Sequence, residues 1–281
     1  MRIIEDSQVL EALSSAIQKI TYHCDPRITE QIGRALEQDP DEYARDVYQA
    51  ILQNHQISAT DQIPLCQDTG STVIFAELGN EVLICGNTLQ EIADQAAAQA
   101  AQSCPLRASI VSDPLFKRIN STNNSPAILH IQQVRGDRLK LCVTQKGGGA
   151  ENMSFLTMFT PATPLEDIRE SIIQSIIDTG SRACPPLVIG IGIGGNFERC
   201  AVLAKRALLE ELGRANPIAE YADLERDILQ ELNSRGCGAQ GMGGILTAIA
   251  VHILQEPCHI ASLPIAVNIQ CHVHRHIEVE L

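Results

Sequence analysis

The sequence predicts an α+β fold, a mixed α/β unit with an N-terminal helical region and one or two sheets flanked by helices. Three observations predict it. Apolar residues recur at helical spacing through residues 6–56. Short runs rich in β-branched residues follow, bounded by turn-forming residues. Helical patterns and strand-like runs then alternate to the C-terminus. We expect residues 1–281 to form one intertwined domain, with helices over about residues 1–60.

The individual elements are predicted from apolar spacing and from capping residues. Thr88 is expected to cap a helix that reaches Ala101, because Glu91 follows in its first turn. The pattern predicts further helices at 164–179, 198–212, 221–233 and 245–254. It predicts strands at 72–78, 81–85, 128–134, 139–145, 187–193 and 264–269. We expect the strands 128–134 and 139–145 to form a hairpin.

Composition limits the classes of function. The 281-residue chain has a net charge of −13, which argues against nucleic acid or an anionic membrane as the main partner. No apolar run is long enough to cross a bilayer, since the run from Gly244 to Leu254 is too short. Acidic residues stand near the N-terminus, where a signal peptide would need an apolar segment. We expect a soluble, cytoplasmic protein.

Ten cysteines are many for such a chain. In a reducing compartment they should be thiols used for packing, catalysis or metal binding. No pair has C-x-x-C spacing, so a zinc ribbon or a thioredoxin-like motif is not indicated. The cysteines that adjoin proline, glycine or polar residues in predicted loops are Cys66, Cys104, Cys184, Cys237, Cys258 and Cys271.

The segment Cys66-Gln67-Asp68-Thr69-Gly70 combines a thiol, an amide, a carboxylate and a hydroxyl between Pro64 and a predicted strand. A soft thiolate beside groups that can orient a substrate is typical of a metal-cluster site. The alternative is an ordinary Asx-turn with a bystander cysteine.

Two glycine-rich segments and a histidine-rich tail are further candidate sites. The loop at 146–152 could approach an anionic group closely, or could simply be flexible. The pattern G-x-G-x-x-G at 190–195 suggests a dinucleotide site, but no acidic strand end follows at the required distance. His272, His274 and His276 alternate, so they would share one strand face, either as a zinc surface or as an exposed polar face.

Five motifs occur together and in order: CQDTG (66–70), KGGGAEN (146–152), GSRACPP (180–186), GIGGNFE (192–198) and GCGAQGMGG (236–244). Together they strongly resemble the class I, iron–sulfur-dependent fumarate hydratases. They equally resemble the α subunit of the L-tartrate dehydratases. The resemblance runs from about residue 5 to the C-terminus and covers only the α-type portion of these enzymes.

The resemblance implies a [4Fe–4S] cluster held by Cys66, Cys184 and Cys271. Three cysteine ligands leave one iron open to act as a Lewis acid on a substrate oxygen. The other cysteines are then expected to pack in the core or to surround the site, with Cys237 and Cys258 nearest to the cluster.

The resemblance also implies substrate contacts and a partner. Gln67, Asp68, Gly148 and His259 resemble residues that bind a small dicarboxylate, and Arg107 resembles an arginine that reaches a neighbouring protomer's site. The catalytic base and further cations are expected on a β-type subunit, in an α2β2 assembly. Fumarate hydration to L-malate would place the enzyme in the tricarboxylic acid cycle. L-tartrate dehydration is the alternative, and a zinc-binding or dinucleotide-binding module is the alternative from a different class.

Overall fold

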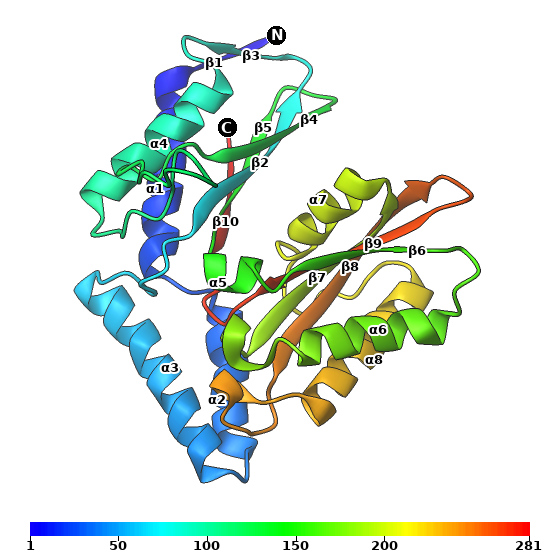
Figure 1. The fold of residues 1–281 in the computed structure, drawn as a ribbon. Coiled ribbons are helices and arrows are strands. Elements are labelled where there is room, and N and C mark those ends of the chain that lie inside the picture. Colours follow the sequence, from blue (N-terminus) through cyan, green and yellow to red (C-terminus); the bar gives the residue numbers. More distant parts are fainter. The chain divides into compact units, whose positions relative to one another are not determined.

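A computed structural model describes residues 1–281 and confirms a mixed α/β fold (Figure 1). It contains two compact units, each built from segments that are interleaved in the sequence. The first unit comprises Met1–Asp25, Asn54–Gly148 and Arg275–Leu281. The second unit comprises Pro26–Gln53 and Gly149–His274. A single intertwined domain stays a prediction. No helix in the structure is both long and apolar enough to cross a membrane.

The first unit is a four-stranded sheet with the order β10-β5-β2-β4 and two helices packed on it (Figure 1). Strands β1 and β3 of this unit pair in parallel and form a separate two-stranded sheet. The bounds of its elements are β1 Arg2–Glu5, α1 Asp6–Tyr22, β2 Ser71–Gly79, β3 Val82–Cys85, α4 Leu89–Ser103, β4 Ile128–Val134, β5 Leu139–Lys146 and β10 His276–Glu280.

Apolar stripes on α1 and α4 create the core of the first unit. Val9, Leu13 and Ile17 of α1 are buried in one cluster with Ile74 of β2 and Val143 of β5. The predicted cap of α4 is confirmed, because the Thr88 side chain accepts a hydrogen bond from the Glu91 N–H and the Glu91 carboxylate accepts one from the Thr88 N–H.

The predicted hairpin of residues 128–134 and 139–145 is wrong, because β2 lies between the two strands. β2 pairs parallel with β4 and antiparallel with β5. Residues 72–76 of β2 are all buried, so this strand needs a neighbour on each side. β4 exposes Ile128 and Ile131 and suits the edge of the sheet.

The second unit is a four-stranded sheet with the order β6-β9-β7-β8 (Figure 1). Helices α6 and α8 cover one face, and α7 packs against the other. Helix α3, Glu42–Asp61, begins in this unit and ends in the first. The other elements are α2 Pro26–Gln38, α5 Gly148–Glu151, β6 Phe155–Phe159, α6 Leu165–Ile177, η1 Gly180–Ala183, β7 Leu187–Gly195, α7 Phe197–Ala207, α8 Ala219–Arg235, η2 Ala239–Gly241, β8 Ala248–Cys258 and β9 Leu263–Gln270.

The glycine pattern at 190–195 lies in strand β7, where helix packing explains the glycines without a bound dinucleotide. Ile189 and Ile191 point into the core beneath α6 and α8. A Cβ built on Gly190 would lie 2.1 Å from the Ala204 carbonyl oxygen, and one built on Gly192 would lie 2.1 Å from the Cys200 carbonyl oxygen. These glycines therefore let α7 approach the sheet closely. Helix α7 ends at Ala207 and not at Leu212 as predicted.

The predicted helix at 245–254 is wrong, because these residues lead into strand β8. Apart from Thr247 and His252 the run is apolar, so its periodicity does not separate helix from strand, while its β-branched residues favour a strand. β8 lies at a sheet edge that side chains cover. Glu225 accepts a hydrogen bond from the Ile253 N–H (2.7 Å), and the Asn216 side chain donates to the Ile253 carbonyl oxygen (2.7 Å). These bonds replace a neighbouring strand.

Candidate functional site

The loop Cys66–Gly70 precedes β2 and packs on the backbone at the end of β5. Gly70 has a φ of +71°, and a Cβ built on it would lie 2.1 Å from the Lys146 carbonyl oxygen. Only glycine fits this position. The Asp68 N–H donates to the Cys66 sulfur over 3.4 Å, and the Cys66 side chain stays partly exposed. The loop is thus held at its glycine while its thiol remains accessible.

The Asp68 carboxylate lies beside the glycine-rich segment that follows β5. A Cβ built on Gly147 would be 3.1 Å from Asp68 Oδ2, and one built on Gly148 would be 3.9 Å from the same oxygen. Two predicted substrate contacts, Asp68 and Gly148, are therefore neighbours in the first unit. Gln67 is exposed next to them in the chain.

Cys184 lies in a tight turn of the second unit, after η1 and before β7. Its φ is +54°, in the left-handed region that non-glycine residues rarely adopt. Its carbonyl oxygen accepts a hydrogen bond from the His272 N–H over 3.4 Å. The structure therefore places the chain segments of Cys184 and Cys271 side by side, although they lie far apart in the sequence.

The glycine-rich loop at 236–244 supports the Cys184 turn. The backbone N–H and the side-chain amide of Gln240 both donate to the Pro185 carbonyl oxygen, over 2.9 and 2.6 Å. The end of this loop is fastened in turn to Asp39, whose Oδ2 accepts from the Ile245 N–H (2.7 Å) and from the Tyr48 hydroxyl (3.0 Å).

Asp39 is buried as a charged group at this attachment. Burial alone would raise the pKa of Asp39, but hydrogen bonds from the Asp41 and Ile245 N–H groups and from the Tyr48 hydroxyl outweigh burial and hold that pKa below its usual value.

The two remaining predicted substrate residues are both exposed. Arg107 is exposed in the irregular segment after α4 of the first unit, and its carbonyl oxygen accepts from the Asn124 side chain (3.1 Å). His259 is exposed in the turn between β8 and β9. Because β8 runs parallel to β7, His259 lies at the opposite end of the second sheet from Cys184 and Cys271. An eleven-residue strand such as β8 spans roughly 35 Å.

The predicted strand face of three histidines is wrong. Residues 271–275 are not in a strand, and β10 begins at His276. His274 is buried at 1% exposure, so the three side chains share no common surface. Within each of the two units, no group of three His, Cys, Asp or Glu side chains is arranged to hold a metal ion.

Burial sets Cys104, Cys142 and Cys200 apart from the predicted ligands, whereas Cys24, Cys85, Cys237 and Cys258 are partly or fully exposed. Desolvation by burial raises the pKa of the Cys200 and Cys237 thiols, which disfavours the thiolate that binds a metal. Cys184 is exposed, and Cys66 and Cys271 are partly exposed.

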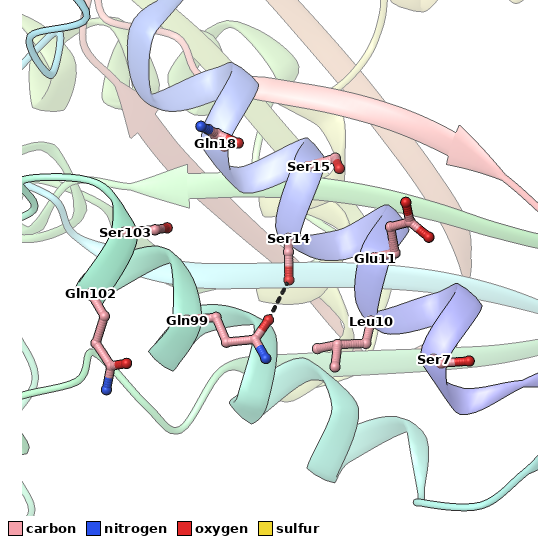
Figure 2. A pocket seen from close by; sticks show the side chains of 9 residues that line it. All are labelled: Ser7, Leu10, Glu11, Ser14, Ser15, Gln18, Gln99, Gln102 and Ser103. Carbon is pink, nitrogen blue, oxygen red and sulfur yellow. Dashed lines mark hydrogen bonds between the residues drawn. The ribbon is translucent and has the colours of Figure 1, made fainter.

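A groove of about 650 Å³ lies between α1 and α4 of the first unit (Figure 2). Its walls are mostly uncharged and polar, and the Ser14 hydroxyl donates to the Gln99 side-chain oxygen over 3.1 Å. The lining residues are Ser7, Leu10, Glu11, Ser14, Ser15, Gln18, Gln99, Gln102 and Ser103. None of them is a predicted site residue.

Sequence reasoning missed two buried cations that flank the first-unit loops. Lys146 ends β5 at 2% exposure, and Arg275 precedes β10 at 1% exposure. In the sequence Arg275 stands between His274 and His276, in a pattern that indicates a histidine face and not a buried cation. Its position four residues after Cys271 was the available signal.

Comparison with known proteins defines the class of enzyme as a hydro-lyase, which adds water to its substrate or removes it. The chain belongs to the fumarate hydratase (Fumerase) family, whose model matches residues 10–280.

Relatives with similar sequences cover nearly the same length. A Methanocaldococcus jannaschii protein, provisionally named L(+)-tartrate dehydratase subunit alpha, is 36% identical over 255 residues, which are 87% of this chain and 88% of that protein. The L(+)-tartrate dehydratase subunit alpha of Escherichia coli (strain UTI89) is 28% identical over 276 residues, which are 95% of this chain and 90% of that protein. The subunit of the same name from E. coli strain K12 is 27% identical over 276 residues, with the same shares.

Proposed function

We propose that this chain is the α subunit of a [4Fe–4S]-dependent hydro-lyase that hydrates fumarate reversibly to L-malate. The observation that carries the proposal is the hydrogen bond that joins the segments of Cys184 and Cys271, in a chain whose family match spans residues 10–280. In this proposal a β-type subunit completes each site, in an α2β2 assembly. The names of the relatives, which are alpha subunits, support such a partner.

The donor chemistry fits an iron–sulfur cluster. Cys66, Cys184 and Cys271 offer thiols that are partly or fully exposed, and thiolates are the preferred ligands of such clusters. Two of the three belong to the second unit and Cys66 to the first. When bound, the cluster supplies a Lewis-acidic iron for an oxygen of the substrate.

The chain's own residues then bind and orient the substrate. Gln67 and Asp68 contact it beside Cys66, and the bare backbone at Gly148 allows its carboxylate to come close. A chain of net charge −13 needs cations from elsewhere to hold a dianion. The β subunit therefore supplies the remaining cationic contacts and the base that takes the proton from the carbon next to the hydroxyl-bearing carbon.

We propose that His259 and Arg107 contact the substrate of a neighbouring site. His259 lies at the far end of β8 from its own chain's Cys184 and Cys271, and in this proposal it contacts a substrate held by another chain. We expect the same of Arg107, which is exposed on an irregular segment.

L-tartrate dehydration is the second candidate reaction, because the relatives at 27–36% identity are named for it. Fumarate and tartrate share the two carboxylates that Gln67, Asp68 and Gly148 would orient.

The cysteines are all free thiols, which fits a reducing compartment such as the cytoplasm.

The test is anaerobic production of the chain alone and together with a β-type partner, followed by assays on fumarate, L-malate and the tartrates. We expect the lone chain to bind iron and sulfide without turning over substrate. Positioning and general-base catalysis are each worth about a hundredfold or more, so losing both removes several orders of magnitude in rate. Adding the partner should restore turnover of one substrate pair. A lone chain that hydrates fumarate at a normal enzymatic rate would disprove the divided site.

A further inference from the structure

Arg275 is a fully buried arginine that makes no ion pair with a carboxylate of the chain. It is 1% exposed, and its Nε and Nη1 atoms have no hydrogen-bond partner. Its Nη2 donates to the Asp68 carbonyl oxygen over 2.8 Å and to the Thr69 carbonyl oxygen over 3.4 Å. A buried charge is costly unless it is paired, so packing alone does not account for an arginine at this position.

The backbone of Arg275 is itself fixed. Its carbonyl oxygen accepts from the Thr144 hydroxyl (2.7 Å) and from the Gln145 N–H (3.2 Å), just before β10 pairs with β5. The guanidinium therefore extends from a rigid sheet to the loop Cys66–Gly70. The same loop is pressed at Gly70 against the Lys146 carbonyl group, so it is restrained on two sides.

We propose that Arg275 is a positioning residue that holds the Cys66–Gly70 loop in the shape in which Cys66 and Asp68 serve the site. Two successive carbonyl groups share one guanidinium nitrogen, which fixes the peptide planes that follow Asp68 and Thr69. A planar guanidinium does this better than an ammonium, because its donors keep a fixed geometry. Its unpaired donors also place positive charge beside a loop where an anionic, thiolate-bound cluster is proposed.

Only the roles of Cys66 and Asp68 rest on the proposed function; the restraint of the loop does not. The first experiment therefore uses the cluster-free full-length chain and measures amide hydrogen exchange by mass spectrometry. Arg275→Ala should raise exchange in residues 67–70 about tenfold, because charge-assisted hydrogen bonds to this loop are lost. Arg275→Lys should give an intermediate rise. Peptides from β7 should exchange as in the wild type.

Arg138→Ala is the matched control. Arg138 belongs to the same unit, but its side chain is exposed and pairs with Glu280 at the surface. This variant removes the same charge, and exchange at 67–70 should not change. In a second experiment, anaerobic reconstitution with iron and sulfide should give less cluster absorbance in Arg275→Ala than in Arg138→Ala, with partial recovery in Arg275→Lys.

Equal exchange at 67–70 in Arg275→Ala and Arg138→Ala would overturn the proposal. Loss of protection throughout the first unit in both Arg275 variants would also overturn it, because the residue would then serve only global stability. If the wild-type chain takes up no iron, the proposed function fails, and the exchange result alone still decides the role of Arg275.

Discussion

Replacing Asp39 with alanine should destabilise the second unit by about 2–4 kcal/mol. The change leaves the Ile245 N–H and the Tyr48 hydroxyl without their carboxylate acceptor. Tyr48 is completely buried, so water cannot readily replace the lost bond. A buried donor that loses its partner costs about 1–3 kcal/mol, and the variant leaves two such donors. Asp39→Ala also removes the cost of burying a carboxylate, which offsets part of this loss.

The assay is urea unfolding of the cluster-free chain, followed by circular dichroism. Asp223→Ala is the matched control, because Asp223 lies in the same unit but forms an exposed ion pair with Arg226, and such pairs are worth about 0–1 kcal/mol. Tyr48→Phe removes the bond that the Tyr48 hydroxyl donates to Asp39 and the one that it accepts from the Leu246 N–H, and it should cost about 1–3 kcal/mol. An Asp39→Ala chain as stable as Asp223→Ala would refute the view that Asp39 fastens the loop at 236–244.

The pH dependence of the free energy of unfolding follows from the lowered pKa of Asp39. A carboxyl whose folded pKa lies below its unfolded value contributes its full stability above the unfolded value of about 4. This contribution is lost as the pH falls through the folded pKa. The stability difference between wild type and Asp39→Ala should therefore be constant near neutral pH and shrink below about pH 4. A difference that grows in acid would contradict the assigned hydrogen bonds.

Two further predictions concern the fold and the cofactor. Gly192→Ala should destabilise the chain by about 1–3 kcal/mol in urea unfolding, because its Cβ would lie 2.1 Å from the Cys200 carbonyl oxygen. Gly33→Ala in α2 is the control, since a Cβ there meets no atom within 4 Å, and it should be neutral or stabilising by up to about 1 kcal/mol. Exposure of the reconstituted holoenzyme to air should remove activity, and iron(II) with a reductant should restore it, because the one cluster iron that no cysteine binds is easily lost. Unchanged activity in air would favour a fully ligated cluster.

The sequence predicted the helices well because their apolar spacing and caps are local features. Thr88 with Glu91 at the start of α4 is one example. Strand pairing depends on partners that are distant in the chain. β2 separates β4 from β5, and nothing within residues 128–145 indicates this.

The run at 245–254 fits helix and strand equally by hydrophobicity. Its strand conformation depends on β7 as neighbour and on Glu225 and Asn216, which satisfy the Ile253 backbone. Local patterns contain none of this information.

The sequence motifs predicted which segments form the candidate site, but not the contacts that hold these segments in place. The five motifs marked the loops that carry Cys66 and Cys184, and the structure adds what holds those loops. Gln240 binds Pro185, and Arg275 binds the carbonyl groups after Cys66. Such supporting contacts depend on tertiary packing, so no single segment shows them.

The most direct test of the account is the iron content of cysteine variants after anaerobic reconstitution. Replacing Cys66, Cys184 or Cys271 with serine should each abolish the iron–sulfur absorbance and reduce bound iron to background. Cys85→Ser and Cys200→Ser are the matched controls and should retain both the absorbance and the iron. Cys85 is the last residue of strand β3, and Cys200 lies on the buried face of α7. Full iron content in Cys271→Ser would contradict the central claim that these three cysteines hold the cluster.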